Sequence, residues 1–343
     1  MSVKHYIITN RDTFVKNGME HIREEGKEPA GHNLRFGIYE FDENNLIAKD
    51  DTGVTLFKDW TEYELKKYQE TGKIPLAKGS QLFFEELYKA MKTHPLNSKK
   101  GDTLVFVHGF NSNLCSALEV IKLLHDRYVK PPESPIAQIV MFTWPARKSL
   151  LRYRDDQKDA QASGFAMGRA YRMFREFLKR FFADEKNKEC ERRLHLMCHS
   201  MGNQVLEAMI KSLTEHRVAL TSVFQNTVLV GADADYDSFE EGKPFSKLID
   251  ICEAIHIFYH KKDRALTVSE TTKNKLNRLG KWGPRQPLEE KGGYHVYDIT
   301  PFKDDLGKGI DDFVNHWSYY TSSDAIRYIT KAFDFTDKSD IPV

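Results

Sequence analysis

The 343-residue chain lacks the features that mark several common classes of protein. It has four cysteines, Cys115, Cys190, Cys198 and Cys252, with no CxxC spacing, so a disulfide framework is not expected and they are predicted to be reduced core residues. Lysine plus arginine is 51 and aspartate plus glutamate is 50, which leaves a net charge of +1. That balance gives no reason to expect a nucleic acid partner.

Long apolar runs are also missing. None follows the first residues, Met1–Tyr6, so neither a signal peptide nor a membrane-spanning segment is expected, and the predicted location is cytoplasmic. Hydrophobic residues nevertheless make up 40% of the chain, which is enough for a sizeable core. The length fits one large α/β domain or two modest ones.

Strand and helix patterns alternate from Asp102 onward, and this alternation predicts an α/β fold. The predicted strands are short apolar runs: Thr103–Val107, Ala137–Thr143, Leu194–Cys198, Thr227–Val230, Ala254–Tyr259 and Tyr294–Ile299. Four predicted helices lie among them: Leu114–Tyr128, Gln157–Phe182, Met201–Leu213 and Leu266–Leu279. Near-continuous apolar strands separated by helices are typical of a mostly parallel central sheet with helices on both faces.

The first part of the chain has a different pattern. Leu34–Phe41 and Gly53–Phe57 read as strands, and apolar residues at helical spacing over Leu82–Met91 predict a helix. We therefore expect a strand-rich N-terminal extension over residues 1–80, packed on a catalytic domain over residues 81–343. Late in the chain, the glycine- and proline-rich stretch Gly280–Gly293 predicts a loop, which we consider as a possible lid.

The most informative segment is Leu194–Asn203. A short apolar strand there ends at Ser200, and a helix follows directly, which is the layout of a nucleophile elbow. Cys198 replaces the first glycine of the usual Gly-x-Ser-x-Gly signature, whereas Gly202 is retained. Both positions need small residues, so the cysteine is acceptable there. The alternative is that Ser200 only caps the helix that follows.

A serine nucleophile needs a histidine base and a carboxylate that orients it. Asp263 and His316 follow later strands, and the order Ser200, Asp263, His316 is that of α/β-hydrolases. His316 is one of 13 histidines, and Asp263 could instead begin the next helix. Three aspartates after an earlier strand are rival acids: Asp233, Asp235 and Asp237.

The negative charge of a tetrahedral intermediate needs backbone N–H donors. Met201, the residue after the serine, would supply one. The loop after Thr103–Val107 would supply the other from Phe110 or Asn111, because Gly109 lets the backbone approach a substrate.

Trp144 and Trp317 follow strand or loop ends near this site, and we expect them to line a substrate pocket. For Trp144, a core position beside a cis or turn proline, Pro145, is an equally good interpretation.

Several blocks of this sequence resemble a bacterial α/β-hydrolase family of unknown function that is described as esterase/lipase-like. The blocks run in the family's order: Val105–Asn111, Thr143–Pro145, His199–Asn203, Asp263–Leu266 and Asn315–Tyr320. Lys262 stands where the family commonly has asparagine, and Asn315 where it has glycine. The resemblance covers roughly Phe83–Phe333 and implies the triad Ser200, Asp263 and His316.

These patterns predict a serine hydrolase that cleaves a carboxylic ester of a small molecule through an acyl-enzyme. No metal or organic cofactor is implied. An acyltransferase or a thioesterase would use the same triad, and a non-catalytic interaction protein could retain the same fold. The oligomeric state and the physiological substrate stay open.

Overall fold

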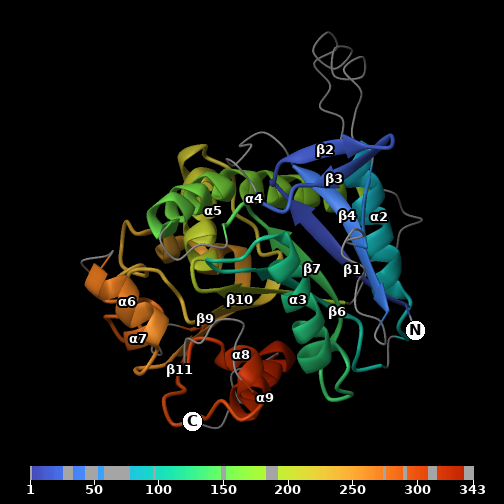
Figure 1. Ribbon diagram of the computed structural model, residues 1–343. Helices are drawn as coiled ribbons and strands as arrows, with labels where there is room; N and C mark the ends of the chain where they lie inside the picture. The colour runs from blue at the N-terminus through green and yellow to red at the C-terminus, as the bar shows by residue number, and fades with distance from the viewer. Residues whose placement is uncertain are drawn as a thin grey trace.

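The computed structural model has a twisted nine-stranded sheet at its centre, with helices packed on both faces (Figure 1). The structure describes residues 2–25, 34–42, 53–57, 78–95, 98–147, 152–182, 192–272, 276–288, 292–307 and 315–335. The strand order is β11-β10-β9-β8-β6-β7-β1-β4-β5. All neighbouring pairs from β11 to β1 are parallel, and β4 and β5 add antiparallel partners at one edge.

The sheet strands have the following bounds: β1 (Ser2–Thr9), β4 (Arg35–Asp42), β5 (Val54–Leu56), β6 (Asp102–Val107), β7 (Ile136–Thr143), β8 (Leu194–His199), β9 (Phe224–Val230), β10 (Cys252–Tyr259) and β11 (Tyr294–Asp298). A separate hairpin is formed by β2 (Thr13–Lys16) and β3 (Met19–Ile22). The eight strands predicted from the sequence are all present.

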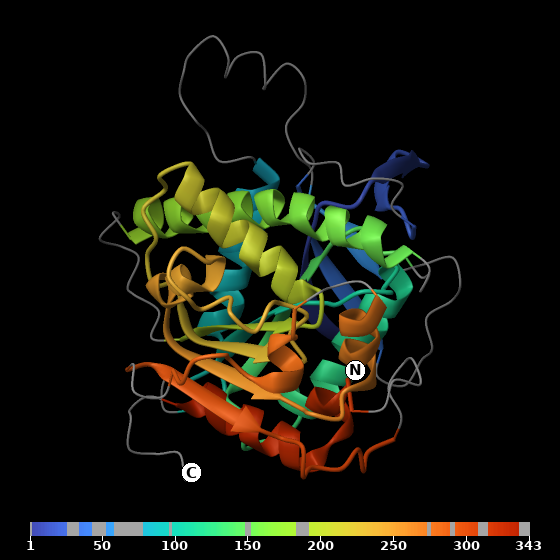
Figure 2. The ribbon, with the colours of Figure 1, turned by 90° about the vertical axis from the view of Figure 1, so that its left-hand side faces the viewer.

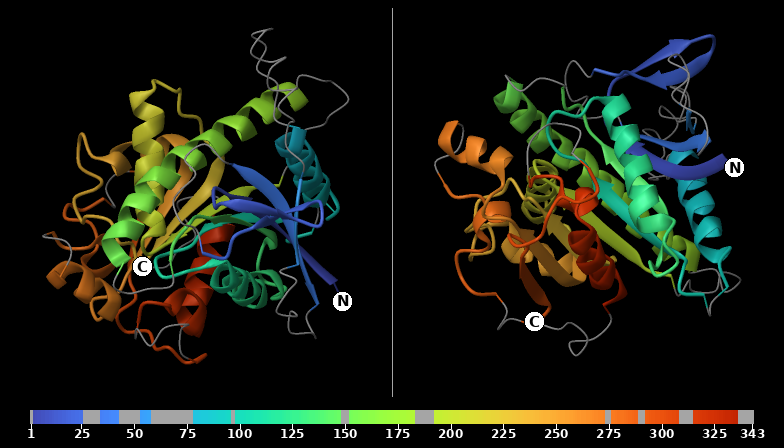
Figure 3. Two further views of the ribbon diagram at one scale, coloured as in Figure 1. Left: turned by 45° about the horizontal axis from the view of Figure 1, so that its top comes forward. Right: turned by 60° about the horizontal axis from the view of Figure 1, so that its bottom comes forward.

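Two layers of helices cover the sheet, because each face of the strands is apolar. On one face pack α2 (Lys78–Lys92), α4 (Tyr153–Phe182) and α5 (Gly202–Glu215). On the other pack α3 (Leu114–Leu124) and α9 (Ser323–Asp334). Figures 2 and 3 show α4 and α5 lying side by side over the sheet. The predicted mostly parallel sheet with helices on both faces is confirmed.

The first strand of the sheet was missed by the sequence analysis. β1 lies between β7, to which it is parallel, and β4, to which it is antiparallel. Its partner β7 is more than a hundred residues away in the chain, and only that pairing makes Tyr6, Ile7 and Ile8 buried core residues. The strands of the N-terminal extension thus continue the central sheet.

Several predicted boundaries differ from the structure. The helix expected over Leu266–Leu279 is α6 (Arg264–Thr272), and a short α7 (Leu279–Trp282) follows an extended Arg278. The predicted loop Gly280–Gly293 therefore begins inside α7. Gly280 packs there against the backbone after β9, where a Cβ would lie 2.0 Å from the nitrogen of Ala232. The helix predicted over Leu114–Tyr128 is also α-helical only to Leu124 and then widens into a π-helical turn, His125–Val129.

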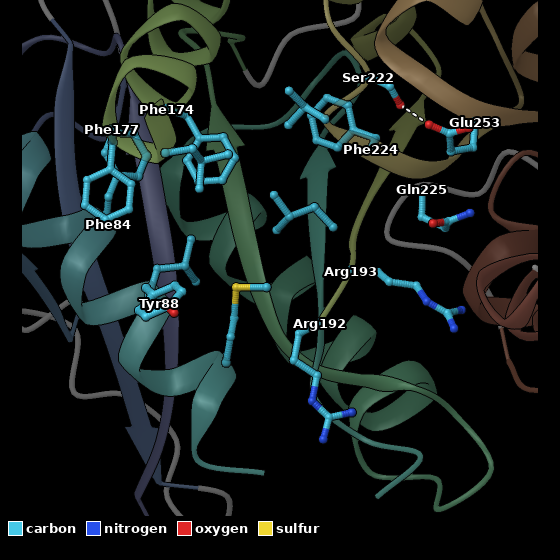
Figure 4. A pocket seen from close by; sticks show the side chains of 15 residues that line it. Phe84, Tyr88, Phe174, Phe177, Arg192, Arg193, Ser222, Phe224, Gln225 and Glu253 are labelled. Carbon is cyan, nitrogen blue, oxygen red and sulfur yellow. Dashed lines mark hydrogen bonds between the residues drawn. The ribbon is translucent and has the colours of Figure 1, made fainter. Parts of the chain in front are cut away.

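An apolar cavity of about 290 Å³ lies between α2 and α4 (Figure 4). Phe84, Phe174, Phe177 and Phe224 line it, and Arg192 and Arg193 lie at its edge. These arginines precede β8, so the cavity is at the amino ends of the central strands. Active sites in parallel α/β sheets lie at the carboxyl ends of the strands, which are at the opposite side of the sheet from this cavity.

Among the residues that the structure describes, no helix combines the length and the apolar character needed to cross a membrane.

Candidate active site

Ser200 is at the apex of a sharp turn between β8 and α5. Its backbone has a φ of +52°, a left-handed conformation that few non-glycine residues adopt and that costs free energy. The turn is held because the Ser200 N–H donates to the carbonyl of Val230, while the Ser200 carbonyl accepts the N–H of Asp233, both at 3.1 Å. These contacts over-determine a strained backbone, as expected for a nucleophile elbow.

Two glycines allow the neighbouring chain to approach this turn. A Cβ on Gly109 would lie 2.8 Å from Cβ of Ser200, and one on Gly202 would lie 2.5 Å from the carbonyl oxygen of Val107. Cys198 is fully buried, and burial raises the pKa of its thiol, so it is a core residue and not a reactive thiolate. Of the two glycine positions in the signature, this chain keeps Gly202, where a Cβ has no room, and replaces the other with Cys198.

His316 and Asp263 form a buried pair. The Nδ1 atom of His316 lies 2.7 Å from Oδ2 of Asp263, and their side chains are 5% and 1% exposed. The other carboxylate oxygen, Oδ1, accepts the N–H of Leu266 in the first turn of α6. Asp263 therefore caps the helix and contacts the histidine at the same time. The two interpretations of this residue that the sequence left open are compatible.

The turn after β9 lies next to both the serine and the histidine. Val230 accepts the N–H of Ser200, and a Cβ on the next residue, Gly231, would lie 3.4 Å from Nδ1 of His316. The carboxyl ends of β6, β8 and β9 are level, because Val107 pairs with Cys198 and His199 pairs with Val230. The residues that follow these strands consequently meet at one edge of the sheet.

The rival aspartates have other partners. Asp233 accepts hydrogen bonds from the hydroxyls of Tyr153 (2.5 Å) and Ser269 (2.9 Å), and Arg278 lies 3.6 Å away. Asp235 binds the same arginine, and Asp237 forms an ion pair with Lys243 at 3.3 Å. The carboxylate beside His316 is that of Asp263.

The predicted oxyanion residues lie in the two expected segments. Phe110 and Asn111 follow β6, and Met201 is the N-cap of α5. Asn111 has a φ of +60°, a left-handed conformation that asparagine tolerates better than most residues. Phe110 packs edge-on against Tyr153 at 5.5 Å between ring centroids. This contact joins the loop to the first turn of α4.

The two tryptophans are buried. Trp144 is 0% exposed and stacks on His108, and its indole N–H donates to the His108 carbonyl at 2.9 Å. Trp317 is 5% exposed and packs on His199. At 0% and 5% exposure the two rings present little surface to a substrate in this structure, and their pocket-lining role stays a prediction. Trp144 fits the alternative of a core residue, and its peptide bond to Pro145 is trans.

No role for His199 was predicted from the sequence. Its Nε2 donates to the carbonyl of His316 at 3.0 Å, and the two rings are 4.7 Å apart. Burial and the neighbouring His316 hold the pKa of His199 well below its usual value, so the ring stays neutral. His199 thus contacts both the backbone and the ring of His316. In the sequence, only its position directly before Ser200 pointed to a role in the site.

Asn315 is the second supporting residue. It has a φ of +66°, its N–H donates to Asp304, and its side-chain amide donates to the carbonyl of Lys262. Glycine, which the resembling family has at this position, adopts a positive φ freely, and asparagine is among the residues that tolerate it best. The substitution therefore keeps the backbone that presents His316 and ties it to the segment of Asp263.

Metal ligands are not gathered anywhere in the described ranges: no group of three or more histidine, cysteine, aspartate or glutamate side chains is placed to hold an ion. The residues at this edge of the sheet include a serine, a histidine and an aspartate, which are the residue types that nucleophilic chemistry by a serine uses.

The sequence was also compared with known proteins. Residues 85–331 match a family described as alpha/beta hydrolase of unknown function (DUF900). None of the curated proteins has a sequence similar enough to be matched with it. The match extends from α2 to α9 and includes the segments around Ser200, Asp263 and His316, and it confirms the family that the sequence blocks suggested. The chain belongs to this family of α/β-hydrolases.

Proposed function

We propose that this hydrolase cleaves a carboxylic ester of a small molecule with a Ser200–His316–Asp263 triad. The observation that carries the proposal is the 2.7 Å contact of the buried Asp263 carboxylate with Nδ1 of His316, beside a serine in a strained elbow. With Nδ1–H donating to Asp263, the Nε2 lone pair of His316 is available as a base.

The proposed reaction has two halves. The Oγ atom of Ser200 attacks the ester carbonyl while its proton passes to Nε2 of His316. The tetrahedral intermediate then collapses, the acyl–oxygen bond to the alcohol breaks, and His316 returns the proton to the leaving alcohol. Water repeats the sequence on the acyl-enzyme and releases the acid. Backbone N–H groups of Met201 and of Phe110 or Asn111 would stabilise the negative oxygen.

A fluorophosphonate probe tests the nucleophile, because it phosphonylates only an activated serine. We expect the wild-type protein to be labelled and Ser200→Ala not to be labelled. Ser222→Ala is the control, since this exposed serine lies before β9 at the opposite edge of the sheet and should leave labelling unchanged. Labelling that persists in Ser200→Ala would mean that another residue is the nucleophile.

Acyl transfer and thioester cleavage are the alternatives for the same triad. A screen of oxygen esters and thioesters over a range of acyl lengths, with and without an added alcohol, separates them. Release of free acid from oxygen esters supports the proposed hydrolase, whereas formation of a new ester favours a transferase. If wild type and Ser200→Ala are equally inert in both assays, the fold serves a non-catalytic role.

A further inference from the structure

Arg11, in the segment that follows β1, is completely buried beside the loop that follows β6. Its exposed fraction is 0%, and its guanidinium reaches the loop that would form the oxyanion hole: Nη2 donates to the carbonyl of Ser112 at 2.7 Å. Ser112 directly follows Asn111, one of the proposed donors. A residue from the N-terminal extension therefore binds the backbone of a loop that belongs to the catalytic machinery.

A second branch of the same guanidinium acts on the other end of this loop through Thr143. Nε of Arg11 donates to the hydroxyl of Thr143 at 2.8 Å, and that hydroxyl lies 3.1 Å from Nε2 of His108. The N–H of Trp144 also donates to Nε2 of His108, so this nitrogen is an acceptor and the Thr143 hydroxyl donates to it. Arg11, Thr143 and His108 thus form a directed chain of hydrogen bonds.

The extension supplies a second contact through Glu24. Its carbonyl accepts the N–H of Leu114 at 3.2 Å and lies 3.4 Å from Nη1 of Arg11, and its carboxylate accepts from the side-chain amide of Asn113 at 3.0 Å. Asn113 is the N-cap of α3, the helix that the loop enters. We call residues 108–113 the oxyanion loop. Arg11 and Glu24, which precede the family match, bind one end of it directly, and Arg11 acts on the other end through Thr143.

Burying the charged side chain of Arg11 costs folding free energy. Burying a guanidinium removes its hydration, and burial lowers the pKa of Arg11 to about 9 even though Asp156 opposes the shift. It is still protonated at neutral pH. Its hydrogen-bond acceptors within the described ranges are neutral oxygens of Glu24, Ser112 and Thr143. An apolar side chain of similar volume would often make the folded state more stable at a buried site. Stability alone therefore does not explain the arginine, whereas a role in positioning the loop does.

We propose that Arg11 is a positioning residue that holds the oxyanion loop in register with Ser200, so that the N-terminal extension is a functional part of the active site. This inference rests on the proposed serine hydrolase. A 1 Å displacement of a donor from the developing oxyanion weakens stabilisation of the transition state much more than substrate binding. Loss of Arg11 should hence lower kcat and leave KM nearly unchanged.

The test compares Arg11→Met and Arg11→Lys in the full chain with wild type. The control is Arg35→Met, because Arg35 also lies in the extension but pairs with Glu20, outside the loop. Each protein is assayed with p-nitrophenyl acetate and with a fluorophosphonate, at a temperature where its circular dichroism shows it folded. We expect kcat and the labelling rate to fall by about 10- to 100-fold in Arg11→Met and by less in Arg11→Lys, with KM and Arg35→Met within about twofold of wild type.

The outcomes separate the two proposals. If wild type reacts at Ser200 and the folded Arg11 variants keep its kcat and labelling rate, the positioning role is wrong and the hydrolase stands. A fall in activity that only follows the loss of folded protein overturns the role as well. If Arg11→Met does not fold, Arg11→Lys decides, because it keeps the charge and loses the fork to Ser112 and Thr143. A wild type that never reacts at Ser200 overturns the proposed function and this inference with it.

Discussion

The two oxygens of Asp263 have different partners: Oδ2 lies 2.7 Å from Nδ1 of His316, and Oδ1 accepts the N–H of Leu266. One residue therefore both orients the proposed base and begins a helix. A mutation that removes the charge but keeps an oxygen should separate these two roles, because only the contact with His316 requires a carboxylate.

The first prediction concerns this separation. Asp263→Asn should lower kcat for an activated ester by about 10⁴-fold, since an amide stabilises neither the required tautomer nor the imidazolium. Its melting temperature should stay close to that of wild type, because asparagine is an equally good N-cap. Asp263→Ala should lose the cap as well, at a cost of about 1 kcal/mol in the free energy of unfolding.

Asp233→Asn is the matched control for that series. Asp233 is buried after β9, but its carboxylate binds Tyr153 and Ser269 and not His316. We expect a loss of stability and a much smaller loss of kcat. A collapse of kcat in Asp233→Asn with Asp263→Asn active would assign the acid to the earlier strand end.

Much of this architecture could be predicted from local sequence. The strands β6 to β11 are short apolar runs, so their place in a parallel sheet follows from composition and alternation with helices. The proposed triad was found in the same way, because Ser200, Asp263 and His316 each follow such a run or its loop. These residues could be predicted because a polar side chain directly after an apolar run is visible from its neighbours in the sequence, without knowledge of any distant contact.

The remaining features depend on contacts between distant segments. β1 is a core strand only because it pairs with β7, and Arg11 is buried only because that pairing brings it behind Ser112 and Thr143. In the sequence, an arginine between Asn10 and Asp12 looks like a solvated turn residue. The sequence left both a pocket and a core position open for Trp144 for the same reason, since its stacking on His108 joins the segments after two different strands.

A second prediction uses two glycines one turn apart in α4. At Gly164 a Cβ would lie 2.4 Å from Cβ of Ala208 and 2.7 Å from the backbone nitrogen of Met209, whereas at Gly168 the nearest atom is 3.6 Å away. Gly164→Ala should push α4 from α5 and destabilise the protein by about 1–3 kcal/mol. Gly168→Ala should instead stabilise it by about 0.4–1 kcal/mol, because alanine favours the helix.

Urea unfolding of the two variants gives both values under one condition. The contrast has a clear sign, since the substitution and the helix are the same and only the space differs. If both variants are more stable than wild type, there is room for a Cβ at Gly164, and α4 and α5 are not as close there as the structure shows.

The third prediction addresses the backbone that presents His316. Asn315 has a φ of +66°. Asn315→Gly should keep activity within a few-fold, because glycine adopts this conformation without strain, although it loses the amide contact with Lys262. Asn315→Val should cost about 1–2 kcal/mol, since a β-branched residue is strongly disfavoured there. Thermal unfolding and kcat measured together would show whether the conformation or the amide contact matters more.

The fourth prediction is a loss of stability in mild acid. Burial, with a contribution from His125, lowers the pKa of His5 to about 3, and burial with the charge of Arg11 does the same for His108. In the unfolded chain both would titrate near 6.5, so below that pH the unfolded state takes up protons that the folded state refuses. Each histidine should thus cost about 2 kcal/mol of unfolding free energy between pH 6.5 and about pH 5.

Urea titrations at a series of pH values measure this slope. His5→Gln removes one of the two groups and should reduce the loss between pH 6.5 and about pH 5, even if the variant is less stable at neutral pH. The free energy of unfolding is expected to stay constant above pH 7 as far as these two groups determine it, because both are then neutral in the folded and unfolded states alike. A wild-type stability that does not change between pH 7 and about pH 5 would contradict the burial of neutral imidazoles at these positions.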